Sequence, residues 1–402
     1  MNFSQLPNDV CLEVAKYLPF HERVRIARVN RWFKEFSNLV ISYTDMFDVT
    51  DPKICRISVE GLSNLIPSFV GHLKVINYNE RDRMPPRYYN TMRDRIKKMS
   101  EFVFGNLLEL NIIMHQSFES SRYIFQIMVN APRLRRMKWR CGEELIEMER
   151  SYRDFRFPNF LYDHLESLDV NCSAECFGSL IKNCPNLRHL TISLPSEMSQ
   201  SSSSEWEATL NEYFAGAPLL HSLHLDGDVF DAENVPNLWS LSRLRSFRMR
   251  SIDLSGPMKM QLINAFPLLE YLELSPENYA DTDIFDFCCL KQLRHWRMIQ
   301  KLGVFCFSDK TDPAKIDGLV WNCQHLESFE MTTPLSESTV KAFIQHCPEL
   351  RLFVLNTLAT YEISRKKKAN KAKKFVESLK FPQKRLTIVF GHRRGGNFIW
   401  SL

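Results

Sequence analysis

Three cations at alternate positions, Arg136, Lys138 and Arg140, have the clearest potential for chemistry in this sequence. If this segment is a strand, alternate side chains project from one face, so the three cations stand together. Arginine binds carboxylate and phosphate groups in a planar, bidentate arrangement. We therefore predict that an acidic or phosphorylated protein segment binds here, with Asp169 as the only acid beside the cations.

A second set of charged residues alternates in sign: Arg248, Glu273, Arg297 and Glu330. They occupy the same position of a sequence pattern that recurs along the chain. On neighbouring parallel strands, opposite charges attract by roughly 0.2–1 kcal/mol per pair. We predict a self-neutralised ladder that fixes strand order and binds no ligand. In the alternative, the ladder binds the substrate and the three cations at 136–140 are structural.

Catalytic motifs are not found: the sequence has no G-x-S-x-G, H-E-x-x-H, P-loop or G-x-G-x-x-G pattern. The evidence for a metal site is weak. Cys172 and Cys176 lie too far apart for a C-x-x-C motif, and Cys288 and Cys289 are adjacent. We predict buried structural cysteines, no metal, no cofactor and no enzymatic activity.

Composition narrows the class of protein. The 402 residues carry a net charge of +5, with 52 basic and 47 acidic residues, which argues against nucleic acid as a partner. No apolar run approaches the roughly 18 residues of a membrane span, and we expect no membrane partner. The 11 cysteines are an odd number, and no secretory signal precedes them. We therefore expect reduced thiols in the cytoplasm, the nucleus or both.

A pattern of the form L-x-x-apolar-x-apolar recurs along most of the chain. Apolar residues two apart point to the same face of a strand, so each occurrence predicts a short strand with one buried face. The spacing of the first leucines is about 22 to 33 residues, which is typical of stacked repeats. These leucines are Leu107, Leu134, Leu165, Leu187, Leu220, Leu244, Leu269, Leu293, Leu326 and Leu350. "GHLKVINY" from Gly71 and "KRLTIVF" near the end fit less well.

Helix signals precede many of these strands, at residues 173–184, 202–217, 257–266, 312–323 and 336–347. Ser204 with Glu207 predicts a capping box, and Asp312 before Pro313 predicts another helix start. Each unit is therefore helix, turn and strand, and only a stack of such units can bury its apolar faces.

Four segments fall outside this pattern. We predict that 80–102 and 143–160 are charged insertions, either solvated or functional loops, and that "SQSSSS" at 199–204 is a flexible loop. The basic run at 365–374 is a nuclear-import signal, an anion-binding patch or an exposed helix face.

The repeated region resembles the leucine-rich repeat family in its long, irregular form. The resemblance covers about residues 60–395 and implies about 11 to 12 irregular repeats. The implied fold is an α/β solenoid with parallel strands on the concave side and helices on the convex side. A non-solenoid α/β domain is the alternative.

The N-terminal segment has a different texture. Val10, Val14, Tyr17 and Leu18 recur at helical spacing, and a second apolar set follows. About 40 residues is the lower limit for independent folding, so this all-helical head either docks on a partner or caps the first repeat.

The head resembles an F-box, through Leu6, Pro7, Val10, Tyr17, Leu18, Val29 and Phe33. It departs from that family where Glu22-Arg23 replaces Asp-Leu and where Trp32 stands one residue early. The family docks on a Skp-type adaptor, which joins a cullin–RING ubiquitin ligase. The resemblance thus implies an F-box at 1–45, repeats that hold a protein substrate, and adaptor-facing residues at Leu6, Pro7, Val10, Val14, Leu18, Val29 and Phe33.

Two other functions remain open from the sequence. One is a repeat scaffold or regulator that binds the adaptor without delivering a substrate. The other is a repeat protein that binds anions or nucleic acid through the basic run, which predicts strong salt dependence.

Overall fold

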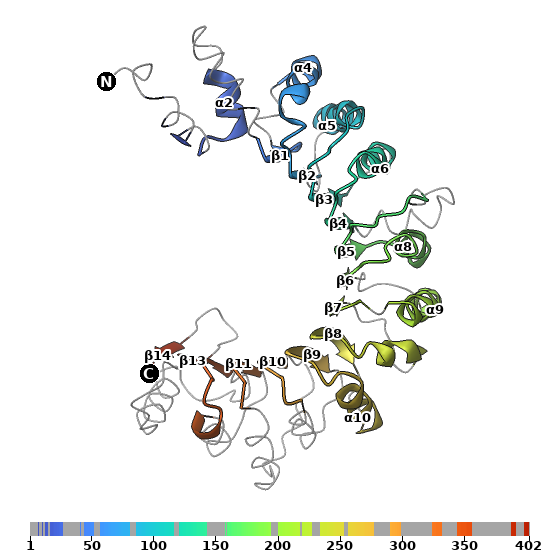
Figure 1. Cartoon of the computed structure of the whole chain (residues 1–402), viewed down its shortest axis with the longest axis vertical. Helices are drawn as coiled ribbons and strands as arrows, with labels where there is room; N and C mark the ends of the chain where they lie inside the picture. The colour runs from blue at the N-terminus through green and yellow to red at the C-terminus, as the bar shows by residue number, and fades with distance from the viewer. Residues whose placement is uncertain are drawn as a thin grey trace. The chain divides into compact units, whose positions relative to one another are not determined.

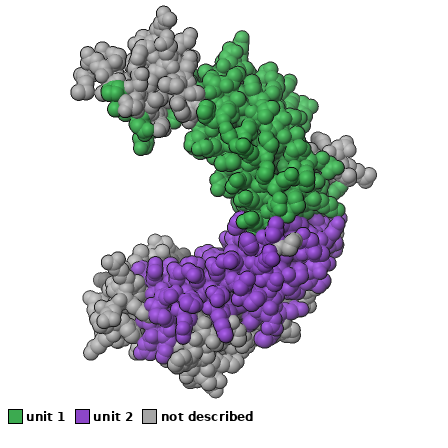
Figure 2. All heavy atoms as spheres, viewed as in Figure 1, with its two compact units in different colours: residues 1–188 green, residues 189–402 purple. Residues whose placement is uncertain are grey.

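The structure is a computed structural model of the chain, and it forms two compact units, unit 1 at residues 1–188 and unit 2 at residues 189–402 (Figure 2). The residues that it describes are 7, 10, 13–14, 17–26, 41, 44–51, 57–80, 86–115, 120–142, 157, 159–193, 200–217, 219–226, 234–252, 256–276, 290–298, 324–331, 344–355, 387–390 and 398–401.

Unit 1 alternates strands and helices after a helical start. Its elements are α2 (Phe20–Ile26), β1 (Met46–Asp48), α4 (Val59–Phe69), β2 (Val75–Asn79), α5 (Pro86–Met99), β3 (Glu109–Met114), α6 (Ser121–Val129), β4 (Arg136–Cys141), β5 (Ser167–Asn171) and α8 (Ala174–Ile181). The strands pair in parallel and in chain order, from β1 to β5. Helices α4, α5, α6 and α8 all lie on one side of these strands (Figure 1).

Unit 2 repeats the same arrangement. Its elements are β6 (His189–Ser193), α9 (Gln200–Ala215), β7 (Ser222–Asp226), η5 (Pro236–Ser240), β8 (Ser246–Ile252), α10 (Gly256–Ala265), β9 (Tyr271–Pro276), β10 (His295–Met298), β11 (Ser328–Met331), β12 (Leu352–Leu355), β13 (Thr387–Phe390) and β14 (Phe398–Ser401). Strands β6 to β13 pair in parallel and in chain order. The last strand, β14, pairs with β13 in the antiparallel direction.

The leucine pattern produces this architecture by burial. In β7, Leu223 and Leu225 are buried, whereas Ser222 and His224 are half-buried on the opposite face. All ten first leucines are buried, from Leu107 to Leu350. Because a fully buried leucine contributes about 1.5–3 kcal/mol relative to an exposed one, the repeated leucines hold each strand to the layer behind it.

The predicted repeat segments are confirmed as strands. The segments from Asn106 to Pro348 form β3 to β12, and the two weaker matches form β2 and β13. Parallel strands with helices on one side are compatible with leucine-rich repeats. The strands also extend past the predicted range of 60–395, because β1 begins at Met46 and β14 ends at Ser401.

The prediction that 80–102 is an inserted loop is wrong. Residues Pro86–Met99 form α5, which buries Met92, Ile96 and Met99 against the core. Proline is favoured at the first position of a helix, where its missing N–H has no partner to lose. The segment is therefore the helix of its repeat.

The predictions at the start of α9 are also wrong. The helix begins at Gln200, so most of "SQSSSS" is helical and Ser204 lies inside the helix rather than at its N-cap. Serine lowers helix stability by less than about 0.7 kcal/mol per residue, which the buried Trp206, Leu210 and Phe214 of the same helix offset. Helix α8, in contrast, follows the prediction: Ser173 caps it and accepts a hydrogen bond from the Cys176 N–H.

Several predictions fall outside the described residues. These are the segment at 143–156, the helix at 312–323, most of the helix at 336–347 and the basic run at 365–374.

Candidate functional site

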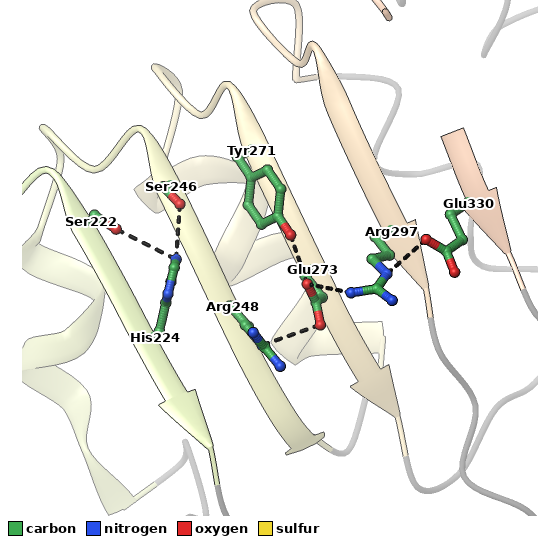
Figure 3. A network of polar contacts seen from close by, with 8 residues as sticks. All are labelled: Ser222, His224, Ser246, Arg248, Tyr271, Glu273, Arg297 and Glu330. Carbon is green, nitrogen blue, oxygen red and sulfur yellow. Dashed lines mark hydrogen bonds and ion pairs between the residues drawn. The ribbon is translucent and has the colours of Figure 1, made fainter. Parts of the chain in front are cut away.

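The ion pairs predicted for the alternating ladder in unit 2 are confirmed. Arg248, Glu273, Arg297 and Glu330 stand opposite one another on β8 to β11. Arg248 Nε lies 3.1 Å from Glu273 Oε1, and Arg297 Nη1 lies 3.3 Å from Glu273 Oε2. Arg297 Nε donates to Glu330 Oε2 at 2.7 Å. Figure 3 shows these contacts in one row across the strands.

Glu273 is the centre of this ladder. Its side chain is only 3% exposed, and it contacts both arginines. It also accepts a hydrogen bond of 2.6 Å from the Tyr271 hydroxyl (Figure 3). A buried carboxylate needs such partners, because an isolated charge in a dry site is strongly destabilising. The geometry therefore commits Glu273 to the fold.

Two pKa values in the ladder reflect these contacts. Burial, the hydrogen bond to Glu273 and the charge of that carboxylate together raise the pKa of Tyr271 to about 12. Burial alone would lower the pKa of Arg297, but Glu330 and Glu273 beside it raise that pKa above its usual value. Both shifts favour the protonation states that the ladder needs.

Histidine and serine side chains on the same face are paired as well. His224 Nε2 lies 3.1 Å from Ser246 Oγ and 3.4 Å from Ser222 Oγ. His295 Nδ1 lies 2.8 Å from Ser328 Oγ. The arrangement supports the interpretation that this face of β7 to β11 is structural.

A further ladder was missed by the sequence analysis. It uses the residue directly after the first leucine of six segments, just before the strand begins. Arg245 Nη1 lies 2.8 Å from Glu270 Oε1, and Arg294 Nη1 lies 3.4 Å from Glu327 Oε1. Arg135 and Glu166 form the equivalent pair in unit 1, at 3.8 Å. Alternation of arginine and glutamate at this position was visible in the sequence.

The three cations of β4 project from one face, as their spacing predicted. Arg136 is the most open, with 62% of its side chain exposed, while Lys138 and Arg140 are 36% and 39% exposed. Arg140 Nη2 donates to Asp169 Oδ2 at 2.9 Å, and Lys138 Nζ lies 3.9 Å from the same oxygen.

The prediction that Asp169 is the only acid beside these cations is wrong. Glu109 on β3 stands opposite Arg136, and its Oε2 lies 2.7 Å from Arg136 Nη2. Counted from the first leucine, Glu109 and Arg136 occupy the third position of their segments, whereas Lys138 and Asp169 occupy the fifth. Among the described residues, three cations therefore face two carboxylates, which leaves an excess of one positive charge.

The N-terminal head presents apolar side chains to solvent. Val10 and Val14 are helical residues and are 42% and 43% exposed. Four residues apart in a helix, they share one face. Tyr17 is 85% exposed, Pro7 is exposed and Leu18 is half-buried. The other predicted adaptor-facing residues, Leu6, Val29 and Phe33, lie outside the described residues.

An F-box domain family model matches residues 3–44. The match confirms the F-box resemblance and places Val10, Val14 and Tyr17 inside that domain. An F-box supports binding of the adaptor of Skp–cullin–F-box ubiquitin ligases. No curated protein matches this chain.

The predicted structural role of the cysteines agrees with the burial of the five that the structure describes. Cys141, Cys172, Cys176, Cys184 and Cys347 are all buried. Burial raises the pKa of Cys184 to about 12, which suppresses its thiolate. Within the described ranges, no group of three or more histidine, cysteine or acidic side chains could hold a metal ion. No helix in those ranges is both long and apolar enough to span a membrane.

Proposed function

We propose that this protein is the substrate-recognition subunit of a Skp–cullin–F-box ubiquitin ligase. One observation carries the proposal: an F-box whose Val10, Val14 and Tyr17 are exposed is followed along the chain by parallel-strand repeats. The F-box binds the adaptor, and the leucine-rich repeats of residues 60–395 bind a protein substrate. The protein works in the cytoplasm, the nucleus or both.

The division of labour follows from the chemistry. F-box proteins are generally non-catalytic, and the ubiquitin-charged partner of the ligase supplies the reactive thioester. This chain contributes proximity, which turns a bimolecular transfer into an effectively intramolecular one.

The substrate site that we propose is the exposed face of β4, with Arg136, Lys138 and Arg140. Their pairs with Glu109 and Asp169 are partly solvated, and such surface pairs contribute only about 0–1 kcal/mol each. An acidic or phosphorylated segment can therefore exchange with these carboxylates and form bidentate contacts with the arginines. The excess positive charge on β4 favours such a partner.

Adaptor binding is tested by adding aspartate to the exposed apolar face. Val10→Asp with Val14→Asp should reduce co-purification of a Skp-type adaptor more than tenfold, because two charges would then be buried at the interface, at several kcal/mol in total. Met260→Asp with Leu268→Asp is the matched control, since these side chains are 49% and 45% exposed in unit 2. Undiminished adaptor binding by the head variant would remove the basis of the proposal.

A further inference from the structure

Helix α2 of the head packs on the first strand and first helix of the repeats. Phe20 is only 8% exposed. Its ring centroid lies 5.1 Å from that of Phe47 on β1 and 5.5 Å from that of Phe69 on α4. Phe47 and Phe69 stack on each other at 5.3 Å, so the three rings form one cluster across three elements.

Polar contacts of α2 reach the same segment. Arg23 Nη1 donates to Thr44 Oγ1 at 3.4 Å, just before β1. Its Nε donates to the Leu18 carbonyl oxygen at 2.8 Å, which joins α2 to the end of the exposed apolar segment. The ring of His21, also buried, lies 3.9 Å from Asp51 Oδ2, just after β1. Neighbouring residues of α2 thus lie against both flanks of β1, and Arg23 is hydrogen-bonded to one of them.

The position of β1 explains why α2 is needed there. In a stack of repeats, each unit covers the apolar face of the next, and the terminal unit needs a cap. Strand β1 pairs with β2 and is the first strand of unit 1. Phe20 covers Phe47, the buried residue of that strand, where an earlier repeat would otherwise lie.

We propose that Phe20 and Arg23 are positioning residues that fix the adaptor-facing segment to the first repeat. This inference rests on the proposed function, because a fixed head matters only if the head binds the adaptor. A fixed head then gives the bound adaptor one orientation relative to β1–β5. The head then does both things that the sequence left open: Val10, Val14 and Tyr17 are exposed for a partner, while α2 caps the sheet. Adaptor binding and the local stability of β1 are then coupled through α2.

The experiment uses the full chain with spin labels introduced as unnatural amino acids at Tyr17 and Glu60, which leaves the native cysteines in place. Both sites are exposed, and Glu60 lies on α4 of the repeats. Pulsed electron spin resonance measures the distance distribution between the labels. Wild type should give one narrow distribution, Phe20→Ala a broad one, and the conservative Phe20→Leu a narrow one again. Met260→Ala, at an exposed site in unit 2, is the control and should match wild type.

Hydrogen exchange with and without a recombinant Skp-type adaptor provides the second readout. In wild type the adaptor should slow exchange of the β1 and β2 amides. Phe20→Ala should still bind the adaptor, but its β1 and β2 amides should exchange about tenfold faster, because local opening of these strands no longer has to disrupt the aromatic cluster. The adaptor should then no longer slow the exchange of these amides.

The outcomes separate the two proposals. If no variant binds the adaptor, the proposed function fails, and the label distances still decide whether Phe20 fixes the head. A narrow distribution in Phe20→Ala, or adaptor binding to wild type without any change in β1 exchange, would overturn the positioning role.

Discussion

The charged strands of the two units use the same alternation of sign in different surroundings. In unit 2, Glu273 is 3% exposed and is shared by two arginines and a tyrosine. In unit 1, Asp169 is 26% exposed and faces Lys138 and Arg140 near solvent. The two regions therefore share the alternation of charge and differ in burial of the acid, and this difference is the basis on which we propose a structural ladder in unit 2 and a binding face on β4.

This difference has an energetic consequence. Removing one partner of a buried ion pair leaves an uncompensated charge, at about 3–5 kcal/mol, whereas an exposed pair contributes about 0–1 kcal/mol. We therefore expect the arginines around the buried Glu273 to stay paired, whereas the cations beside the partly solvated Glu109 and Asp169 can exchange partners with a ligand. The predictions below test this contrast in order of expected effect on stability.

Replacing the buried acid should have the largest effect. Glu273→Ala leaves Arg248 and Arg297 without their shared carboxylate, and we expect a loss of about 3 kcal/mol in the free energy of unfolding. Asp169→Ala is the matched change in unit 1 and should remove less than about 1 kcal/mol. Urea unfolding of both variants measures the difference, and equal losses would show that burial does not separate the two regions.

Reversing one charge in the ladder should have a smaller effect. Arg297→Glu replaces two attractions with two repulsions, toward Glu273 and Glu330, and we expect a loss of about 2 kcal/mol. Arg136→Glu, at a site with one acidic neighbour, should lose less than about 1 kcal/mol. If Arg297→Glu folds normally and abolishes substrate capture, the roles of ladder and β4 are the reverse of those proposed.

The smallest effect concerns the Tyr271 hydroxyl. Its pKa is raised from 10 to about 12 in the folded chain, so its contribution to stability is complete below pH 10. That contribution is lost as the pH rises from 10 through about 12, since the unfolded tyrosine releases its proton more readily. Tyr271→Phe should therefore be less stable than wild type at pH 8, and the two should converge near pH 12. If the difference in unfolding free energy between the two proteins stays constant from pH 8 to pH 12, ionisation of Tyr271 does not contribute to stability.

Much of this fold was predictable because each strand buries one face, so that apolar residues recur at every second position. The alternation at Leu220, Leu223 and Leu225 is enough to locate β7, and the same rule located β2 to β13. Strand β1 was missed because its three residues lack the leading leucine. Helix α5 was missed because charges and a proline pair obscured Met92, Ile96 and Met99, whose spacing by four and three is helical.

The candidate sites were predictable to a lesser degree. Alternating signs located the ladder, because register in parallel repeats follows from the pattern itself. The sequence could not show that Glu273 is buried and Asp169 partly solvated, since burial at the same repeat position depends on neighbouring side chains. Glu109 was missed because β4 was compared with β5 alone. Glu109 lies on β3, the other neighbour of β4.

The most direct test of the central claim is quantitative affinity purification of the wild-type chain and of Arg136→Glu with Arg140→Glu, from cells in which cullin activation is blocked. The account predicts equal recovery of the Skp-type adaptor and selective loss of partners that also become less ubiquitinated in cells expressing the variant. Arg245→Glu with Arg294→Glu, at exposed arginines of unit 2, is the matched control and should retain those partners. Retention of every ubiquitinated partner by the β4 variant would contradict the account.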